Sequence, residues 1–364
     1  MSIEWDRHFI DWLCQEKVGL LVSSYKSSTL FCLGRADYPD ADVPCKLALW
    51  LANFVRTTGL YYSNGVLWMG LQGQLMKLVD VGQMPSEGDG SPFDACLVPR
   101  LTYFISDLDI HDITLDDRGR PYFVATNCNS ICRPTIDGNG DSFEVFWSPP
   151  WIGRLAFEDR CHLNGLCSRD GKPRYVTAVS RTDVIGGWRE HRQKGGVVYD
   201  IIENRVVCEG LSMPHSPRWH SDRLWLLEAG TGHFGYVDGD RFVRKTFIPG
   251  FLRGLSFVGD RYAVICSSSD RHEQLFQGLP LGDRLKKEGM GAKCGIYVVD
   301  LMTFDISHNF HFTKGPIELY DIVVIPGVKR PFVMPLNDGR LMTLRTTGNA
   351  PPVTKGGRST PIEQ

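Results

Sequence analysis

The sequence lacks any long apolar segment. No stretch of the chain approaches the roughly 18 to 20 apolar residues that a membrane-spanning helix needs. The opening residues MSIEWDRHFIDWLCQEKVGLL carry acidic and polar side chains where a secretory signal has an uninterrupted apolar core. We therefore expect a cytoplasmic protein that does not bind a membrane.

An excess of charge of either sign is also missing. The 40 basic and 42 acidic residues give a formal net charge of -2, and no long block carries a single sign. Nucleic acids and anionic membranes are bound by concentrated basic faces. The charge balance therefore argues against both as partners.

The cysteines lack the spacing of a structural framework. There are 11 of them, an odd number, and they are scattered along the chain. A zinc set can be drawn from four, but it lacks the paired C-x₂-C knuckles of structural sites: Cys128, Cys132, Cys161 and Cys167. Without an export signal, we expect buried, reduced thiols rather than a disulfide framework.

What the sequence has in quantity is strand and turn signals. Its 38 glycines and 21 prolines bracket short runs rich in β-branched and aromatic residues. Hairpin signals such as Asp170-Gly171 separate many of these runs. Examples of the runs are GLLVSSY (19–25), GVLWMGL (65–71), RLWLLEAG (223–230) and IYVVDL (296–301). Many short strands with regular turns indicate a sandwich, a barrel or a propeller.

An internal repeat decides between these architectures. A polar residue, an apolar strand, a turn and a second strand recur six times, beginning at Thr58, His111, Asn164, His215, Arg253 and Asp321. The starts are 53, 53, 51, 38 and 68 residues apart, whereas a four-stranded propeller blade needs roughly 40 to 50. The longest interval contains the polar insertion 269–293, which we expect to be a loop. Six copies predict an all-β, six-bladed β-propeller.

The predicted ring closes by joining the two ends of the chain. The stretch after Asp321 is too short for a whole blade. Strands at 19–25 and 29–34 are therefore expected to complete the last blade alongside 321–346. Joining the ends in this way removes the exposed sheet edges that an open ring would leave.

Helices are predicted in only two places. One lies within residues 1–17, and the other covers about 279–289. The first rests on apolar residues that recur at helical spacing: Trp5, Phe9, Ile10 and Leu13. We expect residues 1–346 to form a single propeller domain and 347–364 to form a flexible C-terminal tail.

The first residues of the six copies indicate a central pocket. Each begins an innermost strand, so together they lie at equivalent points around the channel. Five of them are strongly polar although the strands continue with apolar residues. Convergent polar groups on a rigid apolar scaffold are what a ligand site needs. We expect the pocket to contain Thr58, His111, Asn164, His215, Arg253 and Asp321.

One interpretation of this pocket is a metal site. Imidazole nitrogens together with carboxylate and amide oxygens suit several divalent ions. In this interpretation Arg253 holds an anionic group of the substrate through its planar fork. The expected metal ligands are His111, Asn164, His215 and Asp321.

Two other interpretations need no metal. In one, His111 or His215 is a general acid or base, Asp112 or Asp321 orients an imidazole, and Arg253 binds a carboxylate, phosphate or sulfate. In the other, Arg253 and Asp321 neutralise each other, and the remaining polar groups bond to channel water. The residue pattern leaves all three interpretations open.

Two further segments border the predicted pocket. The charged stretch GGWREHRQKGG (186–196) is expected to be a solvated loop whose Trp188 acts as a lid on the substrate. His162 lies two residues before Asn164 and is expected to be a hydrogen-bonded loop histidine. It joins the ring only if its strand starts early.

Several segments resemble a family of bacterial conserved hypothetical proteins of unassigned function. That family is associated with genes for sulfotransferases and tetratricopeptide-repeat proteins, and it implies no established activity. The resemblance lies in SFEVFWSPPWIGRLAFEDRCHLNGLC (142–167), VSRTDVIGGWREHRQKGGVVYDI (179–201), GLSMPHSPRWHSDRLWLLEAGTGHFGYVD (210–238), PGFLRGLSF (249–257) and ELYDIVVIPGVKRP (318–331).

A looser resemblance is to six-bladed propellers of the gluconolactonase and strictosidine-synthase-like type. Such propellers hold a divalent metal or a substrate at the channel mouth with Glu, Asn and Asp from inner strands. Asn164 and Asp321 fit that chemistry. Arg253 and the two ring histidines depart from it.

The function predicted from the pocket is that of an enzyme acting on a small anionic metabolite by hydrolysis, cyclisation or isomerisation, with or without a divalent metal. The expected catalytic residues are His111, His215 and Asp321, and the expected substrate-binding residues are Arg253, Thr58, Asn164 and Trp188. The alternative is a non-catalytic module that binds a ligand or a partner protein, because propellers serve both roles.

Overall fold

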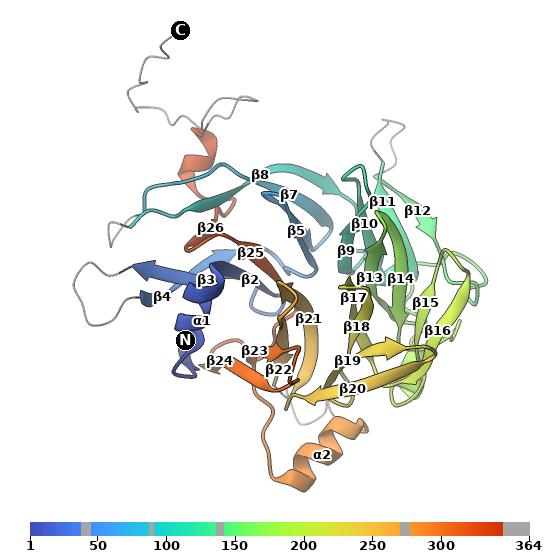
Figure 1. The fold of residues 1–364 in the computed structure, drawn as a ribbon. Helices are drawn as coiled ribbons and strands as arrows, with labels where there is room; N and C mark the ends of the chain where they lie inside the picture. Colours follow the sequence, from blue (N-terminus) through green and yellow to red (C-terminus); the bar gives the residue numbers. More distant parts are fainter. Residues whose placement is uncertain (38–44, 87–90, 136–141, 270–276, 345–364) are drawn as a thin grey trace.

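The chain forms six β-sheets arranged in a ring, as the computed structural model shows (Figure 1). The structure describes residues 1–37, 45–86, 91–135, 142–269 and 277–344. Strands that follow one another within a sheet pair antiparallel, and each sheet extends outward from the axis. This architecture confirms the predicted six-bladed propeller.

The six innermost strands lie nearest the middle of the ring (Figure 1). Each one contacts its neighbours on both sides, so the ring is closed. The strands are β5 (Leu60–Ser63), β9 (Ile110–Leu115), β13 (Leu163–Arg169), β17 (Pro214–His220), β21 (Phe251–Val258) and β25 (Asp321–Pro326). Five of the six predicted ring residues lie within the first three residues of one of these strands, and Thr58 lies two residues before β5.

Three blades are simple four-stranded meanders. The turn after β13 illustrates their local chemistry: Asp170 and Gly171 have φ values of 54° and 70°, as the two-residue hairpins matched to strand twist require. The outer strands are β10 (Pro121–Ala125), β11 (Ser130–Pro134) and β12 (Phe143–Trp147); β14 (Lys172–Ala178), β15 (Gly196–Asp200) and β16 (Arg205–Leu211); and β18 (Arg223–Glu228), β19 (His233–Asp238) and β20 (Arg241–Phe247).

The two ends of the chain share one blade, as predicted. Its inner strand β25 comes from the C-terminal part, and its other strands are β2 (Val18–Ser24), β3 (Thr29–Asp37) and β4 (Cys45–Asn53). The register of β2 on β25 runs from Val18 opposite Pro326 to Ser23 opposite Asp321. All seven residues of β2 are buried, so closure places a strongly apolar strand in the core.

The second strand of the sixth repeat copy lies elsewhere than predicted. We expected 321–346 to lie together in the last blade, but β2 pairs with the edge of β25. Instead β26 (Pro331–Val333) runs parallel to the outer strand of the neighbouring blade. That blade comprises β5, β6 (Val66–Leu71), β7 (Gln74–Asp80) and β8 (Ala95–Phe104).

The N-terminal helix begins later in the chain than predicted. Trp5 belongs to strand β1 (Ser2–Trp5) and pairs with Phe310. Helix α1 (Phe9–Glu16) begins later, because the Asp6 carboxylate accepts hydrogen bonds from the backbone of His8 and Asn309 and ends the strand. The blade that β1 extends comprises β21, β22 (Tyr262–Ser268), β23 (Gly295–Asp300) and β24 (Ile306–Lys314).

The polar insertion between β22 and β23 contains a helix, as expected near 279–289. Helix α2 (Pro280–Glu288) has proline in its first turn and ends at Gly289, which has a φ of 63°. Leu281 and Leu285 bury its apolar face, so this part of the insertion is not a loop. Short 3₁₀ turns occur elsewhere: η1 (Thr126–Cys128), η2 (Gly187–His191) and η3 (Gly339–Met342).

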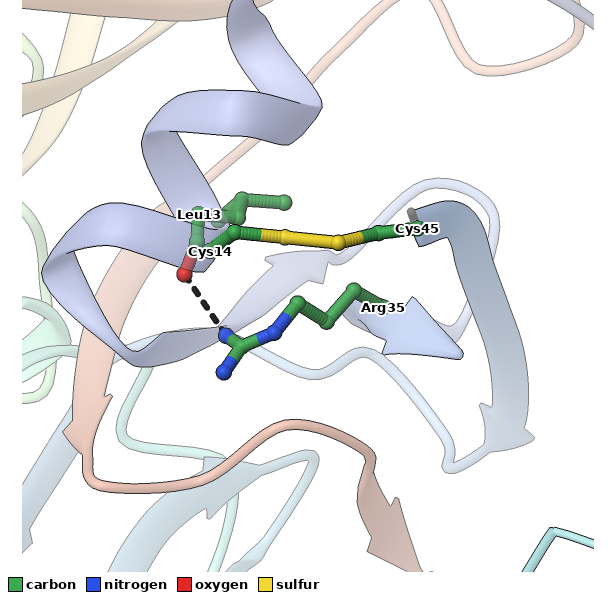
Figure 2. Close-up of a disulfide and its surroundings, with 4 residues drawn as sticks. All are labelled: Leu13, Cys14, Arg35 and Cys45. Atoms are coloured by element: carbon green, nitrogen blue, oxygen red, sulfur yellow. Dashed lines mark hydrogen bonds between the residues drawn. A yellow bond between two sulfur atoms is a disulfide. The ribbon is translucent and has the colours of Figure 1, made fainter. Parts of the chain in front are cut away.

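The cysteines follow the prediction with one exception. Nine are free and buried, whereas Cys14 and Cys45 form a disulfide (Figure 2). The pairing arises because α1 packs beside the start of β4, where Arg35 also donates to the carbonyl of Leu13 at 2.7 Å (Figure 2). This bond links the N-terminal helix to the closing blade.

No helix in the described part of the chain is long and apolar enough to cross a membrane. The predicted tail, 347–364, lies outside the described residues.

Candidate functional site

The channel is crossed by an axial cluster of Arg218, Asp112 and Asp321. Arg218, on β17, donates through Nη1 to Asp112 Oδ2 at 2.8 Å and through Nη2 to Asp112 Oδ1 at 3.2 Å. Its Nη2 also lies 3.7 Å from Asp321 Oδ1, and its Nε donates to the Leu255 carbonyl. The cluster therefore bridges inner strands from four different blades, and the sequence pattern gave no sign of it.

The backbone amides of the remaining blades complete the axial cluster. The amide of Leu60 donates to Asp321 Oδ2 at 2.8 Å, and that of Leu166 donates to Asp112 Oδ2 at 3.1 Å. Burial raises the pKa of Asp321 to about 7, and the nearby Asp112 carboxylate adds to this against the pull of Arg218. All six inner strands thus meet in one buried ionic network.

This network corrects two expectations about Asp321. Its carboxylate contacts Arg218 and backbone amides instead of an imidazole. None of the ion pairs in the described part of the chain joins it to Arg253, so those two residues do not neutralise each other. The reason is that the two carboxylate oxygens of Asp321 face the amides of Leu60 and Ile322 and the guanidinium of Arg218.

His111, on β9, is buried and held by its Nδ1 atom. Nδ1 lies 2.7 Å from Thr126 Oγ1 and 3.1 Å from the carbonyl oxygen of Asp109. Because Thr126 gives its own hydroxyl proton to the carbonyl of Leu163, Nδ1 of His111 must carry the proton in these contacts. Its Nε2 therefore bears a lone pair, and no hydrogen bond among the described residues occupies it.

Electrostatics keeps His111 neutral. Burial lowers its pKa to about 4, and the charges of His162 and Arg253 act in the same direction, while Asp109 opposes them. At neutral pH this imidazole is an uncharged acceptor at Nε2.

His162 forms a dyad with Asp159. Its Nδ1 lies 2.8 Å from Asp159 Oδ2, and its backbone amide donates to Asp159 Oδ1 at 3.0 Å. Its φ of 51° is unusual for a residue other than glycine and turns the ring toward its neighbours. The ring stacks on Trp188 at 4.3 Å and meets His111 edge-on at 5.0 Å. The expected loop histidine thus joins the site.

Asn164 and His215 form the second polar pair. Asn164 Nδ2 lies 3.3 Å from His215 Nε2, while its Oδ1 accepts from Thr177 at 2.7 Å. The amide therefore donates to His215, and the neutral ring carries its proton on Nδ1. Burial, followed by the charge of Arg253, lowers the pKa of His215 well below 6.5. The structure brings these two predicted residues into direct contact.

Arg253 supplies an unpaired positive charge. Its guanidinium lies between two aromatic rings, 5.2 Å from the centroid of Phe251 and 5.0 Å from that of Tyr320. No ion pair among the described residues involves Arg253, and its buried Nε has no hydrogen-bond partner there. A half-buried guanidinium without an ion-pair partner is a suitable binding group for an anion.

Tyr320 is a site residue that the repeat did not reveal. Its ring lies 5.5 Å from that of His111, and its buried hydroxyl has no hydrogen-bond partner in the described chain. Burial raises its pKa well above 10, so the hydroxyl keeps its proton as a donor. The residue precedes Asp321 by one position, which is the offset that places Asp321 on the other side of the strand.

Thr58 is the ring residue that stays apart. Its carbonyl accepts from Ser23, and its hydroxyl lies against Gly70, where an added Cβ would approach it to 2.6 Å. No hydrogen bond within the described ranges joins it to the histidines. We therefore leave Thr58 out of the site.

The arrangement does not match the predicted metal set. In the described residues, no three His, Cys, Asp or Glu side chains are grouped so that they could hold a metal ion. The reason is that Asp321 is bound to Arg218 and backbone amides, and Asn164 turns its NH₂ group toward His215. The zinc set drawn from four cysteines fails the same test.

The fold and this site define a six-bladed propeller with three histidines on or beside its inner strands. The chain belongs to the family described as a domain of unknown function, DUF4915, whose profile matches residues 7–334. No curated protein matches it in sequence.

Three solved structures match this chain to different degrees. A chain from the crystal structure of a nidogen/laminin complex matches with a TM-score of 0.51 and 14% identity, covering 85% of this chain and 99% of that one. A gluconolactonase from Xanthomonas campestris gives a TM-score of 0.45 and 11% identity over 85% and 92% of the two chains. An inactive virginiamycin B lyase from Staphylococcus aureus gives 0.36 and 11% over 85% and 100%. Of these three matches the nidogen/laminin chain has a TM-score above 0.5, and at 14% identity it shows the fold alone.

Proposed function

We propose that this protein is an enzyme that transfers a proton on a small anionic substrate bound at the channel mouth. The observation that carries the proposal is the combination of a half-buried Arg253, which has no ion pair with any described residue, with two histidines whose Nε2 atoms have no hydrogen bond there. Burial of the ionic group of a substrate against Arg253 would bring its reacting atoms beside the two imidazoles. Geometry of this kind supports general acid–base catalysis.

His111 is the base in this scheme. Its Nδ1 proton is fixed by Thr126 and Asp109, so the lone pair on Nε2 is available. A pKa of about 4 makes it a weak base in the free protein. Because the charge of Arg253 contributes to that lowering, an anion bound to Arg253 offsets it and strengthens the base. Binding of the substrate anion thus raises the basicity of the imidazole that takes a proton from the substrate.

His162 is the second proton-transfer group, which takes up a proton at Nε2 and then returns it as an acid. Asp159 fixes the tautomer through Nδ1, as the orienting carboxylate of a catalytic triad does. The carboxylate can compensate a positive charge that forms on the ring during proton transfer. Trp188 covers one face of the ring, so the substrate must approach Nε2 in the ring plane.

Three further groups bind and orient the substrate. Arg253 takes its carboxylate, phosphate or sulfate, and the Tyr320 hydroxyl donates to an adjacent oxygen. His215, held by Asn164, is a neutral donor through Nδ1. Two imidazoles that meet at a 5.0 Å ring separation favour removal and return of a proton on one substrate, as in an isomerisation. Hydrolysis and cyclisation use the same pair.

Solvent deuterium exchange tests this proposal and does not require the substrate to be identified first. The protein is incubated in D₂O with a panel of small carboxylates, phosphates and sulfates that carry an acidic C–H bond, and products are followed by proton NMR and mass spectrometry. We expect deuterium incorporation or conversion of at least one anion. In His111→Gln and His162→Gln the rate should fall by roughly 10² to 10⁴.

His8→Gln is the matched control, because the His8 side chain is 64% exposed at the start of α1. It should retain the full rate. Tight binding of several panel members without exchange or conversion would instead identify a binding module. Turnover that survives both site substitutions would remove the two histidines from the mechanism.

A further inference from the structure

Two loops beside the site expose four large apolar side chains. Leu155 is 53% exposed, Phe157 67%, Val184 63% and Ile185 67%. A single exposed apolar residue is common on protein surfaces, but four on two loops joined by hydrogen bonds are unusual and call for an explanation. We refer to Leu155, Phe157, Val184 and Ile185 as the apolar rim.

Polar contacts at the base of the two loops hold the rim in place. Arg160 Nη1 donates to Asp183 Oδ1 at 2.8 Å, and the backbone amide of Gly153 donates to Asp183 Oδ2 at 3.0 Å. The amide of Gly186 donates to the carbonyl of Asp159 at 2.8 Å. Each rim residue therefore lies on a short segment that is anchored at both ends, and the surface exists before any ligand binds.

The rim is continuous with the catalytic histidines. Asp159, which follows Phe157 by two residues, holds His162. Trp188, three residues after Ile185, stacks on the same ring and is tied back through its amide to the carbonyl of Arg160. A ligand that reaches from the imidazoles out of the channel would therefore pass over Trp188 and meet the rim.

We propose that the rim binds the apolar part of the substrate, so that the site takes amphipathic anions. The anionic group binds Arg253, and an alkyl or acyl chain lies across Trp188 and the rim. The proposal rests on the proposed function for the position of the anionic group. It adds the substrate class: a carboxylate, phosphate or sulfate carrying a hydrocarbon chain of several carbons.

A homologous series of straight-chain carboxylates tests the inference. Binding of butanoate, hexanoate, octanoate and decanoate to the full chain is measured by isothermal titration calorimetry at pH 7, where all four are ionised. Burial of a methylene contributes about 0.8 kcal/mol, which corresponds to about a fourfold tighter Kd per covered methylene. We expect affinity to rise by this increment along the series until the chain extends past the rim.

Two variants separate the rim from the anion site. Phe157→Ser with Ile185→Ser should leave butanoate binding unchanged and reduce the gain per methylene to less than about twofold. Arg253→Gln should weaken every member by a similar factor and leave the gain unchanged. The control carries Ile202→Ser and Met302→Ser, which replace residues 52% and 79% exposed on other loops, and it should match the unmodified protein.

Three results would overturn the inference. They are affinity that does not depend on chain length, a chain-length gain that survives the rim substitutions, and self-association of the protein that the rim substitutions abolish. The last result would assign the rim to a second copy of the chain. A chain-length gain without turnover of any anion would leave the inference intact and reject the proposed function, whereas turnover of short anions without the gain would do the reverse.

Discussion

Asp159 and His162 form a carboxylate–imidazole pair within a single loop, with 2.8 Å between Oδ2 and Nδ1. The pair lies just before β13, and its imidazole meets that of His111 from the neighbouring blade. An orienting carboxylate of this kind has a defined chemical task, because it fixes which ring nitrogen is available to a substrate. The contact therefore turns a loop histidine into a directed proton-transfer group.

Replacement of Asp159 tests that task. Asp159→Asn leaves either Nδ1 or the backbone amide of His162 without its acceptor, and we expect kcat to fall by roughly 10² to 10⁴. The pH profile should also change, which a purely structural role would not cause. Steady-state kinetics on the substrate found by deuterium exchange measures both. Asp170→Asn, at a turn position with its side chain 78% exposed, should change neither.

Arg253 is expected to act on affinity more than on rate. Arg253→Gln removes a charge-assisted hydrogen-bonding fork, which should raise KM about 10- to 100-fold. Arg253→Lys keeps the charge but loses Nε, so it should recover only part of the affinity. If the glutamine variant bound anions as tightly as the unmodified protein, Arg253 would have no place in the site.

The axial cluster is expected to dominate stability. Arg218→Met leaves Asp112 and Asp321 buried without a cation, which should cost about 3 to 5 kcal/mol in the free energy of unfolding. The loss should be larger at pH 8 than at pH 5, because the stranded carboxyls can take up protons at low pH. Urea unfolding at both pH values measures it.

The control for this prediction is Arg241→Met. Arg241 pairs with Asp240 while both side chains are almost fully exposed, so its removal should leave the unfolding midpoint unchanged. Equal effects of the two substitutions would show that the axial network adds nothing to the stability of the ring.

His111 should make stability depend on pH. The pKa of His111 is about 4 in the folded protein, whereas an unperturbed histidine has a pKa of 6.5. Between these pH values the unfolded chain therefore binds a proton that the folded protein does not. The free energy of unfolding must therefore fall as pH drops from 6.5 toward 4, by up to about 3 kcal/mol from this group. Asp321, with a pKa raised to about 7, acts in the opposite direction over much of the same range.

Comparison with a variant isolates the contribution of the histidine. In His111→Gln the change in unfolding free energy per pH unit between pH 4 and 6.5 should be lower than in the unmodified protein by up to about 1.4 kcal/mol, because the opposing contribution of Asp321 is then uncompensated. Urea titrations at half-unit pH steps provide the slopes. Identical slopes would mean that the ring is not buried in its neutral form.

The sequence was sufficient for the architecture because each blade repeats one signal. The polar residue that starts every inner strand is followed by alternating apolar positions, and this pattern located His111, Asn164, His215 and Arg253 correctly at the strand starts. Closure by the N-terminal strands also followed from the lack of residues after Asp321. Both inferences depend only on strand period and chain length.

The predictions about the site that were wrong depend on a shift of one residue along a strand. Tyr320, not Asp321, contacts His111, because adjacent residues of a strand point to opposite faces. The register shift between His215 and Arg218 similarly directs the arginine into the channel. Bulges and pleats of this kind are set by packing across the ring, which a single sequence does not encode in any local pattern.

The most direct test of the account is the protonation of His111, observed by NMR on protein labelled with ¹⁵N-histidine, with His111→Gln to assign its signals. We predict a neutral ring at pH 7 with the proton on Nδ1 and a bare Nε2, a pKa of about 4, and an upward shift of that pKa when sulfate or the substrate binds Arg253. A proton on Nε2 at pH 7, or a pKa that an anion at Arg253 leaves unchanged, would contradict the assignment of His111 as the substrate-activated base.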